Sequence, residues 1–560
     1  MKLNKRFWAL NIFAVILAFC LALSSCSLVV IKGDEDKNKA EETVTKPIDT
    51  ENESNFSEVD GTDDTSNSVA EGIKQPESPS DKAKKRVDAL ANFDFGKQSF
   101  IIATTSSMTF ATDGDSYYDR VLLLRDSIVE EKYNVDIITV FSDEGRIETD
   151  LRNAALADDY FADLISVPEY RIGRLAAEGL IMNLRTLPFY SVESAYSDSK
   201  ESAAGNAVYA DIGAASADFS RIYGVFFNRT VAESLGYDLD KMVDEGEWTW
   251  DTFDRISRMA TEQLGIVGQG SAAMGNEYTD VVFRSANEKL VDNTLGQTPV
   301  ISFDSQRLEA IVELTCNLIY GNPAAYKPAD GTKSSFVSLF SSGQLFLAVA
   351  PLYYMSDFSV CDVQWGILPI PKYDEGQSRY YGYTEAGANV LALPAENNKL
   401  EMTGVMINAL NTASYELLAE EYKTNCLYNY FRDAKAMRSM DAVLDSITFD
   451  FTYLYASGAD LLAAATYGCV REARTSTTAY ATNLINERLE AANAQLAELF
   501  GEKVFEDDVQ LPIPEDTENE DDITESGEPE EGEAEETSAA DSEETAETAE
   551  IAESTEPETE

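Results

Sequence analysis

The sequence of 560 residues contains no histidine. Catalytic triads, Cys-His dyads and imidazole-based zinc sites all need a histidine ring whose pKa lies near neutrality. Its absence therefore excludes these mechanisms. Any catalysis by this chain would have to depend on carboxylates, lysine, tyrosine or cysteine.

Basic residues are also few. The chain has 43 Lys and Arg against 100 Asp and Glu, for a formal net charge of −57. Proteins bind nucleic acids through clustered Lys and Arg that replace counterions on the phosphates. The charge balance therefore predicts no nucleic-acid partner, and it leaves cationic or neutral ligands open.

The acidic residues are concentrated at the C-terminal end. The segment 506–560 has 25 acidic residues, no basic residue and no aromatic residue. The segment 26–92 is rich in Ser, Thr, Asn, Gly and Pro, with acids and bases intermixed. Neither composition buries enough apolar surface to offset the entropy of ordering. We predict a disordered acidic tail over 506–560 and a flexible linker over 26–92.

The N-terminus has the pattern of an export signal. Lys2, Lys5 and Arg6 precede an apolar run over 7–23, which ends in Leu23-Ser24-Ser25-Cys26. This ending resembles the lipobox of bacterial lipoproteins, in which the cysteine is acylated and becomes the first residue of the mature chain. We therefore predict a signal peptide over 1–25 and lipidation of Cys26 at the extracytoplasmic face of the membrane. An uncleaved transmembrane anchor is the alternative, because the apolar run is just long enough.

Cysteine is scarce, with six residues in the whole chain. Cys20 lies in the signal and Cys26 is the predicted anchor. The others form no Cys-x-x-Cys pair, so the sequence does not support a zinc knuckle or a thioredoxin-like site. Buried thiols or one or two disulfides remain open for the four cysteines of the folded region, Cys316, Cys361, Cys426 and Cys469.

The region 93–505 alternates between strand and helix patterns at its start. Apolar stretches at 99–105, 135–140 and 163–167 predict strands, and apolar residues spaced as on one helix face follow each of them. This order predicts a largely parallel sheet with helices on both faces. Ligands of such sheets bind at the carboxyl ends of the strands.

A second lobe is predicted from about residue 223, because 413 residues exceed one ordinary core. Tyr223 to Phe227 predicts a strand and leads into a helix ended by Gly236. Thr249 predicts the N-cap of a further helix, with Asp251 at the positive end of its dipole. More strands are expected over 345–350, 363–370 and 387–393, and helices dominate from residue 402 to a last one over 479–500.

Four motifs, in order along the chain, resemble those of the extracellular solute-binding proteins of ABC transporters, in the carbohydrate group that includes maltose-binding protein. The first is Asp163-Leu164-Ile165-Ser166 with the helix that ends in Glu178-Gly179-Leu180-Ile181-Met182-Asn183-Leu184, and the second is Phe226-Phe227-Asn228-Arg229 through Gly236 with Trp248-Thr249-Trp250-Asp251. The third is Phe340 to Tyr354, and the fourth is Gly366-Ile367-Leu368-Pro369-Ile370-Pro371-Lys372-Tyr373-Asp374-Glu375. The resemblance implies an α/β fold of two lobes with a hinge and an interlobe cleft. It assigns 93–222 and 384–440 to lobe 1, and 223–383 and 441–505 to lobe 2.

The resemblance also implies a function. A monomer without cofactor or metal would close on a small solute, most often a carbohydrate, and deliver it to the membrane subunits of an ABC importer. Loops after the sheet strands would line the cleft, with aromatic rings over the apolar face of a sugar and polar groups on its hydroxyls. The ligand-binding residues expected on this basis are Thr105, Ser106, Glu144, Glu169, Tyr170, Arg171, Phe227, Tyr353 and Tyr354.

Each of these residues also has a structural interpretation. Thr105 and Ser106 fit a simple turn, and Glu169 to Arg171 fit a solvent-facing first turn of a helix. Phe227 and the two tyrosines fit a core, and Glu144 fits a helix N-terminus.

Two other classes of protein compete with the receptor. An exported glycoside hydrolase needs only two carboxylates and no histidine, but its usual barrel requires eight even strand-helix repeats, and the alternation lapses after Leu184. A surface adhesin would suit the anchor, the linker and the tail. Adhesins are more often built of repeated β modules, and the only repetition in this sequence lies in the Glu-Thr-Ala tail.

Overall fold

The structure is a computed structural model. It describes residues 77–192, 199–272, 276–327, 332–385, 388–431, 437–473 and 478–501. The predicted signal peptide, Cys26, most of the predicted linker and the acidic tail over 506–560 lie outside the described residues. Among the helices of the described part, none combines the length and the apolar character that crossing a membrane requires.

The first sheet has five strands in the order β2-β1-β3-β13-β4. β1 pairs in parallel with both β2 and β3, whereas β13 runs antiparallel to β3 and to β4. The predicted strand-helix alternation is confirmed. β13, which overlaps the strand expected over 387–393, is the one described strand of this sheet that runs against the others, and β4 follows it at the edge. The strands are β1 (Gln98–Thr104), β2 (Val135–Phe141), β3 (Leu164–Pro168), β4 (Ile181–Met182) and β13 (Asn389–Pro394).

Helices α3 (Tyr117–Tyr133), α4 (Glu144–Ala157) and α5 (Ile172–Ala177) connect these strands. Each of the first two begins at a side chain that satisfies a free backbone N–H group. Ser116 forms a reciprocal capping box with Asp119, and the Asp143 carboxylate accepts from the Arg146 backbone N–H. The Asp143 cap fixes the start of α4 close to the carboxyl end of β2.

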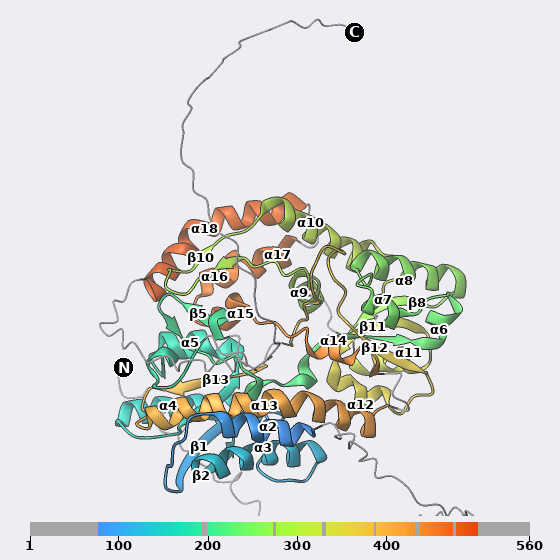
Figure 1. The fold of residues 1–560 in the computed structure, drawn as a ribbon. Helices are drawn as coiled ribbons and strands as arrows, with labels where there is room; N and C mark the ends of the chain where they lie inside the picture. The colour runs from blue at the N-terminus through green and yellow to red at the C-terminus, as the bar shows by residue number, and fades with distance from the viewer. Residues whose placement is uncertain are drawn as a thin grey trace, which may run out of the picture. The chain divides into compact units, whose positions relative to one another are not determined.

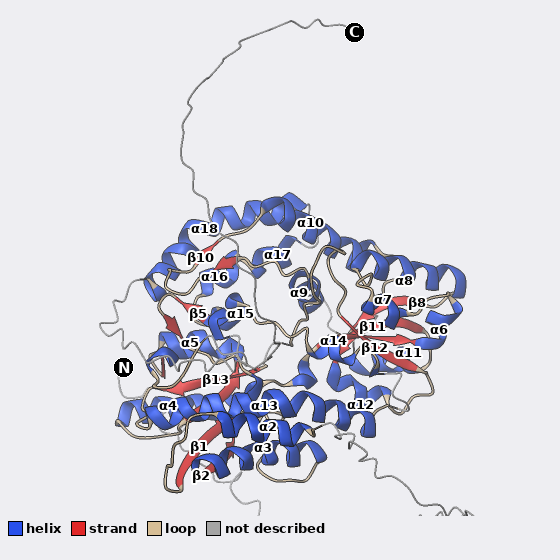
Figure 2. Cartoon of the chain, viewed as in Figure 1, coloured by secondary structure: helices blue, strands red, loops and turns tan. Residues whose placement is uncertain are grey.

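The second sheet has four strands in the order β12-β7-β11-β8. β7 runs antiparallel to both β11 and β12, and β8 runs parallel to β11. Figure 2 shows the strands of the two sheets as separate groups. The strands are β7 (Tyr223–Asn228), β8 (Val267–Ser271), β11 (Leu345–Pro351) and β12 (Trp365–Pro369).

The predicted cap of α8 (Trp250–Leu264) is confirmed, because the Thr249 side chain accepts from the Thr252 backbone N–H. Trp248 and Trp250 are fully buried in the core of the second sheet, and Trp250 Nε1 donates to Ser285 Oγ at 2.8 Å. These rings therefore belong to the core of the second sheet.

The remaining elements are two-residue strands and helices of different lengths. The strands are β5 (Ala203–Ala204), β6 (Ala207–Val208), β9 (Val291–Asp292) and β10 (Val300–Ile301). The helices are α2 (Pro79–Ala89), α6 (Arg229–Ser234), α7 (Leu239–Asp244), α9 (Asn276–Ser285), α10 (Ser305–Cys316), α11 (Lys333–Ser341), α12 (Met355–Phe358), α13 (Leu400–Asn429), α14 (Met440–Leu444), α15 (Phe451–Tyr455), α16 (Asp460–Ala465), α17 (Tyr467–Ala473) and α18 (Thr478–Phe500).

Three segments run side by side between the two sheets, and we call them the crossing segments: 218–222, 382–385 together with Ala388, and 445–450. Ile222 forms a bridge with Thr384, and the Glu385 backbone N–H donates to Arg221 O at 2.9 Å. The Gly382 backbone N–H donates to Ser446 O at 2.6 Å. The predicted multi-stranded hinge is therefore present as hydrogen-bonded backbone.

The expected content of the second lobe needs one correction. Residues 441–505 were assigned to it, but α15 packs against α5 and against the 3₁₀ turn Glu169–Arg171 of the first sheet. Phe451 of α15 and Ile485 of α18 share one buried cluster with Ile165 of β3. α18 also packs against α10 (Figure 1), so these C-terminal helices connect the two sheets at a second place.

The predicted linker also ends earlier than expected. Instead of a flexible chain to residue 92, Pro79–Ala89 form α2, which lies along α13 and α3 (Figure 1). Ser78 caps α2 through the Asp81 backbone N–H, and Ala83 and Val87 are fully buried. The sequence pattern does not predict this helix, because only these two apolar positions face the core.

Removal of α2 is expected to destabilise the folded region. A chain that begins at residue 93 should have a free energy of unfolding at least about 2 kcal/mol lower than one that begins at residue 77, because it loses the buried Val87 side chain and uncovers α13. Urea unfolding of the two chains measures the difference. Equal stability would contradict the packing of α2.

The cysteines of the folded region are thiols. Within the described residues no disulfide joins Cys316, Cys361, Cys426 and Cys469, and the last three are buried. Burial raises the pKa of the Cys426 thiol to about 12, so it stays protonated and unreactive at neutral pH. Of the two alternatives left open by the sequence, the structure has buried thiols.

Candidate functional site

A cavity of about 420 Å³ lies where strand ends of both sheets meet the crossing segments. Its walls come from the loop after β1, the end of β2, the turn after β11 and two crossing segments. This volume suits a small organic solute. The lining residues are Thr105, Ser106, Ser107, Met108, Phe141, Asp218, Ser220, Arg221, Tyr353 and Glu385. We call this cavity the cleft.

The polar side chains of the cleft form one connected group around Arg221. Its Nη1 lies 3.1 Å from Glu385 Oε2, and its Nε lies 3.4 Å from Asp218 Oδ2. Asp218 also accepts from the Ser106 hydroxyl at 3.3 Å. The guanidinium thus joins two crossing segments, and Ser106 ties them to the first sheet. Together these groups offer both donors and acceptors to a ligand.

Tyr353 connects the second sheet to the polar side chains around Arg221. It follows β11 in a 3₁₀ turn, its side chain is 37% exposed, and its hydroxyl donates to Glu385 Oε1 at 3.0 Å. Burial and the neighbouring Glu385 charge raise the pKa of the Tyr353 hydroxyl, so it remains a donor at all physiological pH values. The exposed ring is therefore held in place at its polar end.

Phe141 provides an aromatic surface from the first sheet. It is the last residue of β2 and is 56% exposed although its side chain is wholly apolar. Its ring lines the cavity and is therefore available to a ligand. The cleft thus contains one exposed aromatic ring from each sheet.

Glu144, Tyr170 and Arg171 come together beside the cleft. The Tyr170 hydroxyl donates to Glu144 Oε2 at 2.6 Å, and Arg171 Nη2 lies 2.6 Å from the same oxygen. Burial raises the pKa of Glu144, but these hydrogen bonds outweigh it and lower the pKa overall, and the charge of Arg221 acts in the same direction. The three residues bind one another, and their contact with a ligand stays a prediction.

Two predicted site residues belong to the core. Phe227 is fully buried in the second sheet, under the Arg229 guanidinium, and does not reach the cleft. Tyr354 is 5% exposed and its ring packs against Phe336 and Phe358. For these positions the ligand-binding expectation is wrong, because β7 is buried on both faces and the 3₁₀ turn after β11 directs Tyr354 inward.

Glu169 is also buried, at 3% exposure, and not part of the cleft wall. Its backbone N–H donates to Ala388 O at 2.8 Å, which connects β3 to a crossing segment. Burial raises the pKa of the Glu169 carboxyl to about 7, with Arg284 lowering it and Asp450 raising it. Glu169 is thus a buried acid at the junction of the two sheets.

The raised pKa of Glu169 predicts a pH-dependent contribution to stability. Because the folded-state pKa lies above the unfolded value, this group favours the folded state below about pH 4.5, and the contribution is lost as the pH rises through about 7. Compared with wild type, Glu169→Gln should therefore gain about 2 kcal/mol in free energy of unfolding between pH 5 and pH 8. Urea unfolding of both proteins at the two pH values tests this; a constant difference would contradict it.

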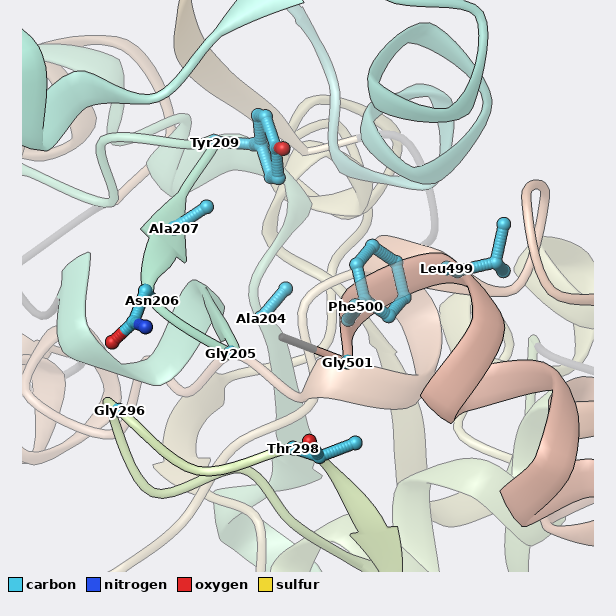
Figure 3. A pocket seen from close by; sticks show the side chains of 10 residues that line it. All are labelled: Ala204, Gly205, Asn206, Ala207, Tyr209, Gly296, Thr298, Leu499, Phe500 and Gly501. Atoms are coloured by element: carbon cyan, nitrogen blue, oxygen red, sulfur yellow. The ribbon is translucent and has the colours of Figure 1, made fainter. Parts of the chain in front are cut away.

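A second cavity is too small for a solute. It has a volume of about 30 Å³, room for a water molecule. Figure 3 shows it between the β5–β6 turn and the end of α18, with the Tyr209 and Phe500 rings among its walls. Among the residues that the structure describes, no group of three or more Cys, Asp or Glu side chains is placed to hold a metal ion.

Sequence reasoning found Thr105, Ser106 and Tyr353 of the cleft but missed Phe141, Asp218, Arg221 and Glu385. Phe141 was detectable, because it ends a predicted parallel strand, one residue beyond the predicted boundary. The other three lie in crossing segments with no periodic pattern, so their position follows only from the tertiary fold.

Two lobes joined by three crossing segments around a cavity with walls from both sheets define a protein that binds a solute between lobes. Residues 123–401 match the family model described as bacterial extracellular solute-binding protein. The chain belongs to this family, as the motifs predicted, and its two-lobe α/β fold is that of solute-binding proteins.

The solved structures that resemble this chain are only distantly similar to it in sequence. A galacto-N-biose/lacto-N-biose I-binding protein of an ABC transporter from Bifidobacterium longum, in complex with lacto-N-biose, is 14% identical, with a TM-score of 0.46 over 73% of this chain and 99% of that chain. The GacH receptor of Streptomyces glaucescens is 13% identical, with a TM-score of 0.42 over 72% and 98%.

A family 1 extracellular solute-binding protein from Alicyclobacillus acidocaldarius is likewise 13% identical, with a TM-score of 0.43 over 71% of this chain and 98% of that chain. No curated protein matches the chain.

Proposed function

We propose that this protein is a receptor for a sugar or oligosaccharide, which it binds in the cleft. The observation that carries the proposal is the pair of exposed aromatic rings, Phe141 from the first sheet and Tyr353 from the second, beside a connected polar group. A sugar has apolar C–H faces and a rim of hydroxyls. Flat rings cover the faces at low entropy cost, and charged groups bind the hydroxyls.

The polar group favours a neutral polyol over a strongly charged solute. Asp218 and Glu385 are acceptors, Arg221 is a donor, and Ser106 and Tyr353 supply hydroxyls. Because Arg221 is the one base paired with both carboxylates, the three groups together carry one net negative charge, which disfavours an anion and neutralises at most one positive charge. Paired charges of this kind bind hydroxyls through charge-assisted hydrogen bonds.

Closure of the lobes on the sugar is part of the proposal. A ligand that contacts Phe141 and Tyr353 at once stabilises the closed arrangement, because it touches both lobes only there. The protein is proposed to act as a monomer, without cofactor, metal or nucleic acid, and to deliver the sugar to the membrane subunits of an ABC importer. The lipid on Cys26 is proposed to hold it at the extracytoplasmic face of the membrane.

A thermal-shift screen of mono- and oligosaccharides, polyols and amino acids tests the receptor function. A saccharide present at about 100-fold its Kd should add roughly 2.7 kcal/mol to the free energy of unfolding. A response to amino acids alone would contradict the sugar assignment.

The competing function is a glycoside hydrolase in which Asp218 and Glu385 are the two carboxylates. Incubation with the saccharide that gives the thermal shift distinguishes the two functions. The receptor is expected to return the saccharide intact, as seen by chromatography after many hours. Cleavage that disappears in Glu385→Gln would show the enzyme instead.

A further inference from the structure

A buried arginine connects the loop after β1 to the chain that leads into the first crossing segment. Arg125 of α3 is fully buried, and its neighbour Asp126 is 5% exposed. Arg125 Nε donates to Asp126 Oδ1 at 2.8 Å, and the guanidinium lies 4.4 Å from the centre of the Phe110 ring. Arginine is almost never fully buried unless it is paired. The position of this charge inside the first lobe therefore requires a physical reason.

The Arg125 guanidinium holds two backbone segments together. Its Nη1 donates to Thr109 O at 2.9 Å and, at a longer distance of 3.5 Å, to Ala215 O. Thr109 belongs to the loop after β1, and residues 105–108 of this loop line the cleft. Ala215 precedes Asp218, which begins the crossing segment 218–222 and also lines the cleft. One buried side chain thus joins the two segments close to their cleft residues.

The same two segments meet again inside the cleft. The Ser106 hydroxyl donates to Asp218 Oδ2 at 3.3 Å. Thr109 supports Ser106, because the Thr109 hydroxyl donates to Ser106 O at 3.0 Å. Asp218 in turn lies 3.4 Å from Arg221 Nε. The position of Thr109 relative to Ala215 therefore influences how Ser106 and Asp218 meet.

Stability alone does not explain the ion pair of Arg125 and Asp126. Removing two charges from water costs about as much as their attraction returns, so apolar residues of similar volume often give equal or higher stability. Burial raises the pKa of the Asp126 carboxyl, and the Arg125 charge opposes this rise without cancelling it. Arginine differs from an apolar residue in its planar fork of donors with fixed directions. Such a fork is suited to holding two carbonyl groups at a set spacing.

We propose that Arg125 is a positioning residue of the cleft. Through Thr109 O and Ala215 O it sets the spacing between the loop after β1 and the crossing segment 218–222. This spacing aligns Ser106 with Asp218, which then bind the hydroxyls of the solute. The inference rests on the proposed function, because Arg125 acts on the affinity of the cleft for its sugar and does not touch the sugar itself.

The double variant Arg125→Met/Asp126→Leu tests the proposal without leaving an unpaired buried charge. The folded variant should bind the saccharide from the thermal-shift screen about tenfold more weakly than wild type, because a hydrogen bond to a charged acceptor loses its alignment. Calorimetric titration below the unfolding transition measures this affinity, which a merely structural role would leave unchanged. An affinity equal to that of wild type would overturn the proposal.

Two further variants complete the experiment. Arg125→Lys keeps a charge beside Asp126, so it should fold even if the double variant does not, and it should bind the saccharide at least about threefold more weakly because it lacks the fork. Arg229→Met/Asp240→Leu removes an ion pair of the second lobe and should bind like wild type. Wild-type affinity in Arg125→Lys, or an equal loss in the second-lobe control, would also overturn the role of Arg125.

A crystal structure of the unliganded double variant, or of Arg125→Lys, tests the geometry without any solute. The distance from Ser106 Oγ to Asp218 Oδ2, 3.3 Å in the wild-type protein, should increase beyond about 3.5 Å, the limit of a hydrogen bond. A hydrogen bond retained between Ser106 and Asp218 would overturn the proposal. Because no sugar is present, failure here is distinct from failure of the sugar screen.

Discussion

Tyr353→Ala should lower the affinity for the cleft solute about 30- to 100-fold and cost the unliganded protein much less stability than the neighbouring Tyr354→Ala. The Tyr353 side chain is 37% exposed, so its loss removes less buried surface from the free protein than loss of the 5% exposed Tyr354. A ring that stacks on a sugar contributes about 2–3 kcal/mol when the complex covers it, which corresponds to this factor. Calorimetric titration and thermal unfolding of the same preparation measure both effects.

Tyr353→Phe separates the ring from its hydroxyl. It keeps the apolar surface but removes the hydrogen bond to Glu385 Oε1, so we expect a loss of less than about tenfold. A fall in melting temperature for Tyr353→Ala without loss of affinity would contradict the role of Tyr353 and would make it a core residue.

Tyr354→Ala should have the opposite effect. Although adjacent in sequence, Tyr354 is 5% exposed and packs against Phe336 and Phe358. Truncation of a buried aromatic side chain leaves a cavity and costs about 3–5 kcal/mol. Urea unfolding should therefore show a large loss of stability, and the protein that remains folded should bind the solute with an affinity close to that of wild type.

The two tyrosines are controls for each other. If Tyr354→Ala lost affinity while keeping its stability, the orientation of the 3₁₀ turn Leu352–Tyr354 would be wrong. The pair therefore tests which of two neighbouring rings faces the solute.

Much of the fold was predictable because its signals are local. Thr249 was recognisable as a cap from its own residue type and the run that follows it, and the apolar stretches of β1, β2 and β3 marked the parallel strands to within one or two residues. Helix α2 was not recognisable, because Ala83 and Val87 are its only buried residues and its composition is that of a linker. An amphipathic pattern also does not show which sheet a helix such as α18 packs against.

Residues of the cleft were predictable only where they follow the end of a strand. Thr105 and Tyr353 follow β1 and β11, and strand ends of α/β sheets are where ligands bind. Whether a side chain faces the cleft or the core was not predictable in fully buried β7, because burial on both faces removes the alternation that would have oriented Phe227. Arg221 and Glu385 meet only because two crossing segments, far apart in the sequence, pair through their backbones.

A crystal structure of residues 77–560 with the saccharide that gives the largest thermal shift tests the central claim most directly. The sugar is expected in the cleft, with its ring faces against Phe141 and Tyr353 and its hydroxyls on Arg221, Asp218 or Glu385. A saccharide bound outside the cleft, or one that leaves both aromatic rings exposed to solvent, would contradict the proposed function.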